Sequence, residues 1–405
     1  YTTNTRPYDV ALGDVNNDGL LDMVTAGYAA NSVAVLLGAG DGSFGERTTF
    51  ATDAGTNKVR LADLDGDGNL DIAATNLEAD TVSILLGDGT GGFTAIAPFT
   101  EIGDFPTDLA FGDLDGDGVL DMIVVNQRDN NVTVALGNGD GTFTLLANYV
   151  TGAMPTSVSL GDFDGDGVLD MVTDSQLTDS VGVRLGNGDG TFGDLASHAV
   201  GAAAFDTAVG DVDGDGNLDI VTANNPNRSV SALLGNGDGT FRPYRRTFTV
   251  YQPTEVVLAD FDGDGYLDIF ALNTSNNRVS LLVNDGAGGF FGDTFGRTGN
   301  HALGMAVGDL NGDGLLDVVT ANRNDNSASS ILANGYLDTI ERYRLEHLRV
   351  DGNAHWYAIN TAVTGYLTLE AVYTGAATDL AITLYDETGS GVPLATSTAV
   401  SLGGG

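Results

Sequence analysis

The sequence predicts an all-β fold, a seven-bladed β-propeller of four-stranded antiparallel blades, on three observations. An acidic motif recurs seven times at intervals of 49 or 50 residues, which indicates one structural unit repeated in tandem. Between the motifs, short segments alternate apolar and polar residues with the period of a strand and end in Gly-rich turns. No helical periodicity flanks any copy of the motif.

The motif is a nine-residue stretch such as residues 113–121, Asp-Leu-Asp-Gly-Asp-Gly-Val-Leu-Asp. Oxygen-bearing side chains occupy positions one, three, five and nine, position six is Gly, and position eight is Leu in every copy. Carboxylates that alternate along an extended chain converge only if the chain turns tightly, which the Gly permits. The motif therefore predicts a loop around a hard cation. An EF-hand is excluded, because the closing acid is Asp at position nine instead of Glu at position twelve.

Calcium is the expected ion, about seven in all and one per blade, because each loop offers three or four carboxylates and no His or Cys. Position seven varies, as expected where only its backbone carbonyl is a ligand. Plain Asp/Gly-rich turns are the alternative, but turns need no oxygen ligand at four fixed offsets. The predicted ligands are Asp14, Asn16, Asp18, Leu20 and Asp22; Asp63, Asp65, Asp67, Asn69 and Asp71; Asp113, Asp115, Asp117, Val119 and Asp121; Asp162, Asp164, Asp166, Val168 and Asp170; Asp211, Asp213, Asp215, Asn217 and Asp219; Asp260, Asp262, Asp264, Tyr266 and Asp268; and Asp309, Asn311, Asp313, Leu315 and Asp317.

One repeat predicts four strands. In the third copy these are residues 107–113, 122–126 and 131–136, with a fourth strand that runs through Tyr149 and Val150. Four strands of about six residues and connections of similar length account for one repeat. Seven such sheets form either an open stack or a ring, and a ring removes the exposed ends.

The chain ends favour closure of the ring. Blade seven has three predicted strands, residues 305–308, 318–321 and 328–332, but lacks the usual turn toward a fourth. Residues 1–5 align with the fourth-strand tails of other repeats, such as residues 149–151. The N-terminal segment is therefore expected to supply the outer strand of blade seven.

The acidic motif, together with the turn Gly-Asn-Gly-Asp-Gly-Thr-Phe at residues 186–192 and 235–241, resembles the FG-GAP/VCBS repeat. This family is familiar from the head of the integrin α-chain and from many secreted bacterial proteins. The resemblance covers residues 1–337 and implies calcium in the loops between strands one and two, on the face opposite the usual ligand face. Asn16 and Asn311 depart from the Asp at position three, which implies slightly weaker binding in blades one and seven.

Beyond residue 337 the repeat stops, and residues 356–359, 367–370 and 380–386 predict further strands. Their pattern resembles the start of the bacterial pre-peptidase C-terminal β-sandwich, with a generic β domain as the alternative. The expected organisation is a propeller over residues 1–337 and an incomplete β-sandwich-like segment over residues 338–405.

The net charge of −40 disfavours nucleic acid and anionic membranes as partners, because the long-range field repels both. The chain has no cysteine, so metal instead of disulfides is expected to hold the loops. No apolar run is long enough for direct membrane insertion. Calcium loops need concentrations found outside cells, so an extracellular or cell-surface location is expected, with Tyr1 following a removed or omitted leader.

No catalytic constellation stands out, and the chain is not expected to be an enzyme. His198, His301, His347 and His355 are scattered and lack Ser or acidic partners at a recognisable spacing. The Gly-rich turn has no Lys and no following helix, which excludes a phosphate loop. Its aromatic residues are expected to pack between blades: Phe44, Phe93, Phe143, Phe192, Phe241 and Phe290.

Four arginines occur in the connections between strands two and three, at the end opposite the calcium loops: Arg128, Arg228, Arg278 and Arg323. Arg6 and Lys58 are expected in adjoining connections. This face is predicted to bind a protein or an anionic glycan, and local pairing with Asp129, Asp325 or neighbouring loop acids is the alternative. An adhesion or ligand-binding module is thus the expected function. The alternatives are a self-assembling subunit of a surface layer or filament, and a polysaccharide lyase or other carbohydrate-active enzyme.

Overall fold

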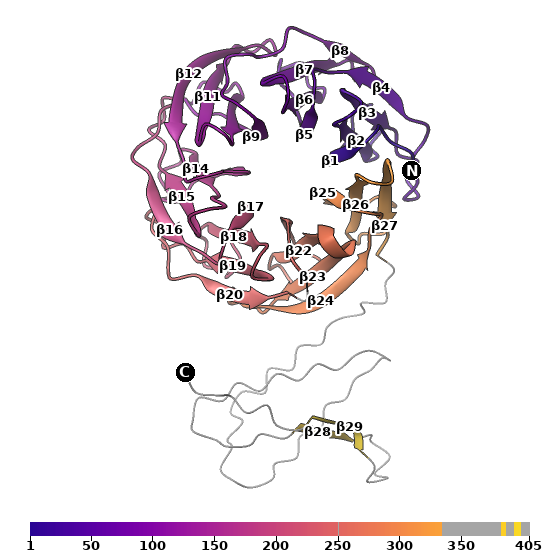
Figure 1. Cartoon of the computed structure of the whole chain (residues 1–405), viewed down its shortest axis with the longest axis vertical. Helices are drawn as coiled ribbons and strands as arrows, with labels where there is room; N and C mark the ends of the chain where they lie inside the picture. The colour runs from indigo at the N-terminus through magenta and orange to yellow at the C-terminus, as the bar shows by residue number, and fades with distance from the viewer. Residues whose placement is uncertain (250, 334–381, 386–392, 398–405) are drawn as a thin grey trace. The chain divides into compact units, whose positions relative to one another are not determined.

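The computed structural model describes residues 1–249, 251–333, 382–385 and 393–397. By its internal contacts the chain divides into two units, Tyr1–Thr339 and Ile340–Gly405. The first unit is a ring of seven antiparallel sheets around a central axis (Figure 1), which confirms the predicted β-propeller. In the second unit, β28 (Ile382–Tyr385) pairs with β29 (Pro393–Ser397). The predicted β-sandwich otherwise falls on residues outside the described ranges.

Each blade is a meander in which the strands follow one another from the centre of the ring outward (Figure 1). The blades are β1 (Pro7–Gly13), β2 (Asp22–Gly27), β3 (Ser32–Leu36) and β4 (Thr48–Ala51); β5 (Thr56–Ala62), β6 (Asp71–Asn76), β7 (Thr81–Gly87) and β8 (Phe93–Ala95); β9 (Pro106–Gly112), β10 (Asp121–Asn126), β11 (Asn131–Gly137) and β12 (Phe143–Val150); β13 (Val158–Gly161), β14 (Asp170–Thr173), β15 (Ser180–Arg184) and β16 (Ala196–Ala199); β17 (Ala204–Gly210), β18 (Asp219–Asn224), β19 (Ser229–Leu233) and β20 (Arg245–Phe248); β21 (Glu255–Ala259), β22 (Asp268–Asn273), β23 (Arg278–Asn284) and β24 (Phe290–Arg297); and β25 (Ala302–Gly308), β26 (Asp317–Asn322) and β27 (Ser327–Ile331).

The burial of the strands follows from their place in the ring. The second strand of every blade is buried along its whole length, because a neighbouring sheet covers each of its faces. Outer strands such as β4, β16 and β20 are largely exposed. Among the described residues no helix is long and apolar enough to cross a membrane.

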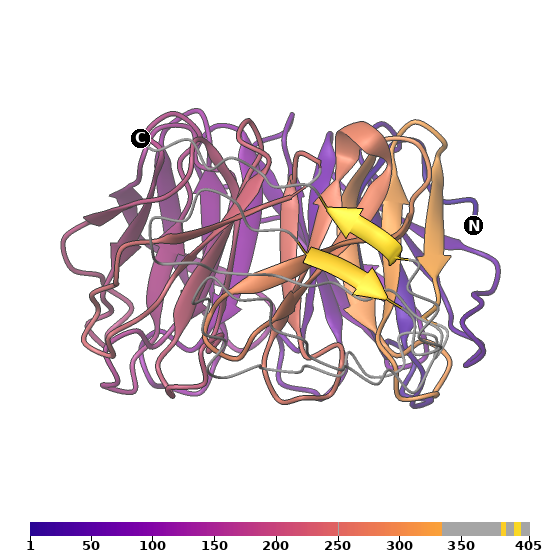
Figure 2. The same cartoon turned by 90° about the horizontal axis from the view of Figure 1, so that it is seen from below.

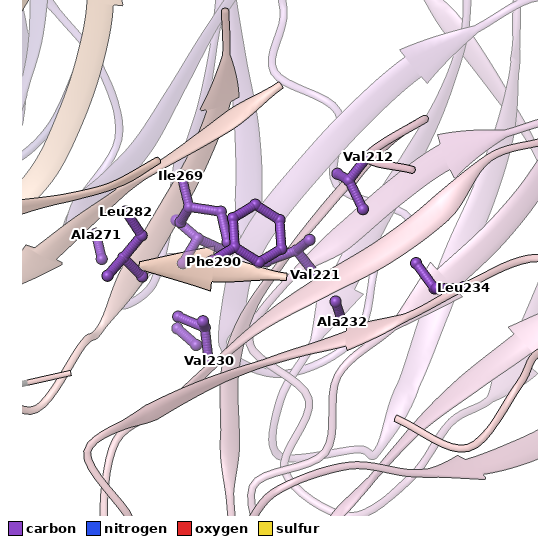
Figure 3. Close-up of a cluster of buried hydrophobic side chains, with 11 residues drawn as sticks. Val212, Val221, Val230, Ala232, Leu234, Ile269, Ala271, Leu282 and Phe290 are labelled. Atoms are coloured by element: carbon purple, nitrogen blue, oxygen red, sulfur yellow. The ribbon is translucent and has the colours of Figure 1, made fainter. Parts of the chain in front are cut away.

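The core consists of separate apolar clusters between adjacent blades. In the cluster between blades five and six, Phe290 lies among aliphatic side chains such as Val221 and Leu282 (Figure 3). In the other blades, the Phe of the turn between strands three and four (the 3–4 turn) also belongs to the cluster that its blade shares with the preceding blade. The predicted packing role of these residues is confirmed.

An aromatic contact accompanies this packing at several blade junctions. The ring of Tyr149 on β12 meets Phe192 of the next blade edge-on, with 5.6 Å between centroids. The same edge-on contact joins Phe50 to Phe93 at 5.2 Å. Such pairs contribute beyond the area they bury, so they reinforce each junction.

The first residues of the chain close the ring. The Tyr1 amino group donates to the Ala328 carbonyl at 2.8 Å, the Ala328 N–H donates to the Tyr1 carbonyl at 2.8 Å, and Thr2 bridges Ser327. The Tyr1 ring meets Phe44 of blade one edge-on at 5.3 Å, as other outer strands do at their junctions. The N-terminal segment thus occupies the place of the fourth strand of blade seven, next to β27, as its alignment with other fourth-strand tails predicts.

Blade four differs from the others at its inner strands. β13 and β14 have four residues each, whereas β9 and β10 have seven and six. Beyond β14, the buried Asp174 carboxylate accepts hydrogen bonds from the Thr156 N–H at 2.6 Å and the Ser157 N–H at 2.8 Å. A side chain therefore replaces strand pairing here, and burial raises the pKa of Asp174 to about 7.

We expect Phe192→Ala to lower the free energy of unfolding by roughly 3 kcal/mol, because it removes a buried ring and leaves a cavity between blades. Phe248→Ala is the control, because Phe248 is 71% exposed on β20 and its loss should change stability by less than about 0.5 kcal/mol. Urea denaturation of both variants measures the difference. Equal losses would contradict a packing role that is specific to the junction.

Asp174→Asn tests the titration of this carboxyl group. Because its folded-state pKa lies above the unfolded value, the neutral form is stabilised, and stability is lost as the pH rises from about 4 to 7. The wild type should lose on the order of 4 kcal/mol through this group, and the Asn variant should not. The melting temperature of the variant minus that of the wild type should therefore increase between pH 5 and pH 8. A difference independent of pH would show that Asp174 does not titrate in this range.

Candidate metal centres

The seven acidic motifs form the connections between strands one and two, and all lie at one end of the ring. Figure 2 shows the ring from the side, with strands running between its two ends. The 3–4 turns lie at the same end as the motifs, because the blades are antiparallel meanders. The connections between strands two and three, which include the short helix η1 (Thr274–Asn276), lie at the opposite end.

Each motif curls around its first carboxylate. In blade three, Asp113 accepts hydrogen bonds from the Gly116 N–H at 2.7 Å and the Gly118 N–H at 3.0 Å. The carboxylate of Asp117 accepts the Val119 N–H at 2.8 Å. The glycine at position six has φ between +83° and +90° in all seven copies, a conformation that side chains disfavour, which confirms the tight turn. These glycines are Gly19, Gly68, Gly118, Gly167, Gly216, Gly265 and Gly314.

The turn brings together carboxylates that are separated in sequence. In five blades, oxygens from positions one, three and nine lie within 4.8 Å of one another. In blades one and seven, position three is an amide, and the Asn16 and Asn311 side chains donate to the position-five carboxylates at 3.0 and 3.1 Å. The convergent clusters are Asp63, Asp65 and Asp71; Asp113, Asp115 and Asp121; Asp162, Asp164 and Asp170; Asp211, Asp213 and Asp219; and Asp260, Asp262 and Asp268.

These clusters suit a metal ion with oxygen ligands. Carboxylates at such distances repel one another, and a hard cation between them reverses that interaction. The Oδ1 atom of Asp213 is buried without a hydrogen-bond partner, so it is available as a ligand. The five all-carboxylate clusters can therefore hold a metal ion. The position-five carboxylates do not belong to these groups in the described residues. Their role as ligands, and that of the position-seven carbonyls, stays a prediction.

The aspartate at position nine has a second role that the motif does not reveal. In blade three, the buried Asp121 carboxylate accepts the Leu114 N–H at 2.8 Å and the Gly137 N–H at 2.9 Å. It thereby ties position two of the loop to the start of the 3–4 turn. The same pair of hydrogen bonds is made by Asp22, Asp71, Asp170, Asp219, Asp268 and Asp317.

Burial raises the pKa of the position-nine carboxyl group in every blade, although its two N–H donors act in the opposite direction. In Asp170, Asp219 and Asp268 it reaches about 6. The other carboxylates of the same loop contribute to this increase. A bound divalent cation would favour the ionised form of this carboxyl group. The same side chain is therefore a hydrogen-bond acceptor within the blade and a candidate metal ligand.

A further hydrogen bond connects the loops of blades one to five and of blade seven with the next blade around the ring. The position-two carbonyl of Leu64 accepts the N–H of Gly141, in the 3–4 turn of blade three, at 3.1 Å. In blade six, where Asn replaces the first Gly of the turn, the Asn284 amide donates to the Val212 carbonyl at 2.7 Å. The geometry of these six acidic loops is therefore coupled to the junctions between blades.

Blade five carries a basic residue that sequence reasoning did not single out. Arg242, which directly follows the Phe of its turn, approaches Asp213 at 3.1 Å and Asp215 at 3.0 Å. The other turns have Gly, Thr or Phe at that position. A guanidinium beside the position-three and position-five carboxylates opposes cation binding at this loop by repulsion.

At the opposite end, three of the four predicted arginines rest on aromatic rings. Arg128 lies 4.1 Å from the Phe105 centroid, Arg278 lies 5.8 Å from that of Tyr251, and Arg323 lies 5.1 Å from that of Tyr8. Arg128 also pairs with Asp104 at 3.2 Å, so local pairing occurs, although not with Asp129.

Three other basic residues are predicted for this face: Arg228, Arg6 and Lys58. Arg228 and Arg6 are exposed in connections at this end. The placement of Lys58 in a connection was wrong, because it lies on the inner strand β5. There its ammonium pairs with Asp9 at 3.3 Å and Glu255 at 2.9 Å. The sequence could not show this, because both acids come from other blades.

The two described histidines occupy separate places. His198 packs edge-on against Phe241 at 5.0 Å in a blade junction, and burial lowers its pKa. His301 lies near Arg323, and burial together with that charge lowers its pKa. His347 and His355 fall outside the described residues.

The fold and the acidic loops define a class of protein, a seven-bladed β-propeller with candidate cation loops between the first and second strands of its blades. A family model described as FG-GAP-like repeat matches residues 14–74, 63–124, 113–173, 211–271 and 260–320. The chain therefore belongs to the FG-GAP-like repeat family. Curated proteins yielded no match by sequence.

Several solved structures share the fold. One is a lectin from Agrocybe aegerita, described as recognising non-reducing terminal N-acetylglucosamine, at 24% identity and a TM-score of 0.50, covering 71% of this chain and 79% of that chain. Another is BBS1N in complex with ARL6DN, at 9% identity and a TM-score of 0.59, covering 81% of this chain and 92% of that chain. A third is virginiamycin B lyase from Staphylococcus aureus, at 11% identity and a TM-score of 0.55, covering 81% of this chain and 96% of that chain. At these identities the similarity shows the fold alone, which is consistent with a ligand-binding module.

Removal of divalent cations should lower the melting temperature by roughly 10 °C or more. A site adds about 2.7 kcal/mol when the free ion stands at a hundred times its Kd, and several sites act together. Calorimetry in calcium and in chelator measures the shift, and calcium added back in excess should restore the higher value. An unchanged melting temperature in chelator would contradict a structural role for cations in these loops.

Proposed function

We propose that this chain is a calcium-stabilised binding module that acts outside the cell or at its surface. In this proposal the ring end opposite the acidic loops binds a protein or an anionic glycan. The observation that carries the proposal is the division of the ring into two ends, one with convergent carboxylates and the other with arginines seated on aromatic rings.

Calcium is favoured by the chemistry of the loops. Every convergent ligand is a carboxylate oxygen, and hard cations with flexible coordination prefer such sites. Loops of this type require calcium at concentrations that are found outside cells, which supports the proposed location. In this view the metal end supplies rigidity, and the opposite end supplies recognition.

The arginine face has the properties of an anion-binding surface. A guanidinium held over an aromatic ring is oriented before a ligand arrives, so less conformational freedom is lost on binding. Its N–H groups match carboxylates and sulfates in bidentate geometry. On a chain of net charge −40, a local group of cations also directs anionic ligands to one end of the ring.

A binding role is proposed in preference to catalysis or nucleic-acid recognition. The described histidines are apart, and the acidic surface repels phosphate backbones. The lectin among the similar structures is a propeller that recognises a sugar, which supports a glycan as one ligand class without identifying it. Self-assembly into a surface layer is the competing structural role.

The test replaces Arg128, Arg228 and Arg323 together by Ser and measures binding to an array of carboxylated and sulfated glycans in excess calcium. The matched control replaces Arg242, Arg245 and Arg246, which lie in the turn and on the outer strand of blade five away from this face, by Ser and so changes the net charge equally. We expect at least a tenfold weaker binding, about 1.4 kcal/mol, for the first variant alone.

Equal binding by both variants and the wild type would remove the arginine face from the proposal. A wild type that binds no array member, but grows in mass with concentration in the ultracentrifuge, would favour the structural role instead.

A further inference from the structure

A second group of charged residues lies inside the ring, away from the acidic loops. The inner strands of all seven blades, β1, β5, β9, β13, β17, β21 and β25, line a cavity of about 200 Å³ at the centre. Its charged lining consists of Asp9, Lys58, Arg60, Asp108, Asp206 and Glu255. None of these residues belongs to a repeat motif, so the loop sites do not explain them.

The two cations of this central cluster are already engaged. Lys58 pairs with Asp9 at 3.3 Å and with Glu255 at 2.9 Å. Arg60 pairs with Asp9 at 3.3 Å and with Asp108 at 2.6 Å. With four carboxylates and two cations, the fully ionised cluster carries two uncompensated negative charges.

Asp206 and the second carboxylate oxygen of Glu255 are the parts of the cluster that neither cation contacts. Glu255 is only 8% exposed, and its Oε2 atom is buried without a hydrogen-bond partner. Among the described residues Asp206 makes no ion pair; it accepts the Val256 N–H at 2.9 Å. Burial, followed by the charge of Glu255, raises the pKa of Asp206. A buried carboxylate oxygen without a partner is costly, so positive charge beside the Glu255 Oε2 atom and Asp206 would stabilise the cluster.

The aspartates of the cluster share one backbone anchor. Asp9 and Asp108 accept the N–H of Val59 and Val158, the corresponding residues of the next inner strand, at 3.0 and 3.2 Å. The remaining oxygen of each pairs with Lys58 or Arg60. Asp206 has the same anchor but no basic partner, and this difference marks the side of the cavity where a cation is missing.

We propose that Asp206 and Glu255 bind one hard divalent cation in the centre of the ring, at a site separate from the seven loops. The donors are oxygens, which such ions prefer, and the hydroxyl-bearing residues Ser159 and Thr207 also line the cavity. Its volume leaves room for waters that complete the coordination. A charge of +2 neutralises the cluster.

A cation here would connect two adjacent blades and, through the pair of Lys58 with Glu255, a third blade across the cavity. Asp206 belongs to blade five and Glu255 to blade six, and Lys58 links Glu255 to blade two across the cavity. The ion would therefore stabilise the ring from its centre, whereas the loop ions act at one end.

The test uses crystals of the full chain at pH 8 with Mn²⁺ as the only divalent cation, and anomalous difference maps at the manganese edge. Peaks in the loops serve as internal references. We expect an additional peak with Asp206 and Glu255 oxygens about 2.2 Å away. Asp206→Asn combined with Glu255→Gln should abolish this peak and leave the loop peaks. The matched control, Glu101→Gln combined with Asp104→Asn, changes two acids outside the cavity and should keep all peaks.

Equilibrium dialysis supplies a second readout. The wild type should bind one more Mn²⁺ per chain than the Asp206 and Glu255 double variant. If that variant does not fold, the wild-type crystals decide alone. Occupied loops with no central peak would overturn the proposal and show that protons neutralise the cluster instead.

Discussion

A buried carboxylate at position nine of each motif is the interaction on which the propeller depends most. Asp121 and its six counterparts accept one N–H from the loop between strands one and two and one from the turn between strands three and four. A charged acceptor makes stronger hydrogen bonds than a neutral one, so a single residue holds both connections of a blade together. The same group faces the convergent carboxylates, which makes its ionisation and the occupation of the loop interdependent.

The hydrogen bonds of this buried carboxylate also position the connections between blades. Position two of each loop donates to the buried carboxylate. In six of the loops its carbonyl also accepts a hydrogen bond from the next blade, as Leu64 does from Gly141. The apolar clusters and edge-on aromatic pairs complete each junction. Metal binding, blade geometry and ring closure are thus parts of one network. The arginine end lies outside that network, so its connections can vary without disturbing the acidic loops.

Sequence reasoning worked best where the repeat itself carries the information. The seven blades, the glycine turns, the Phe at the junctions and the partner strand for β27 all follow from local pattern and alignment. It failed where a residue is defined by others far away in the chain. Lys58 was assigned to a surface connection, but Asp9 and Glu255 draw it into the centre of the ring. The contacts of Arg242 with Asp213 and Asp215, and of Asp174 with the backbone of blade four, likewise cannot be predicted from the spacing of the repeat.

The amino-acid sequence alone determined the architecture and the identity of the acidic loops, because both arise from a short motif whose residues act within a few positions of one another. Only the tertiary structure decided which charges meet at the centre, which arginines stack on rings, and how each loop is tied to its neighbour. Those features depend on groups that packing and ring closure bring together from distant positions, such as Tyr8 with Arg323, and Lys58 with Glu255, which are 197 residues apart. Pairing over such separations is set by the geometry of the closed ring, which local pattern does not encode.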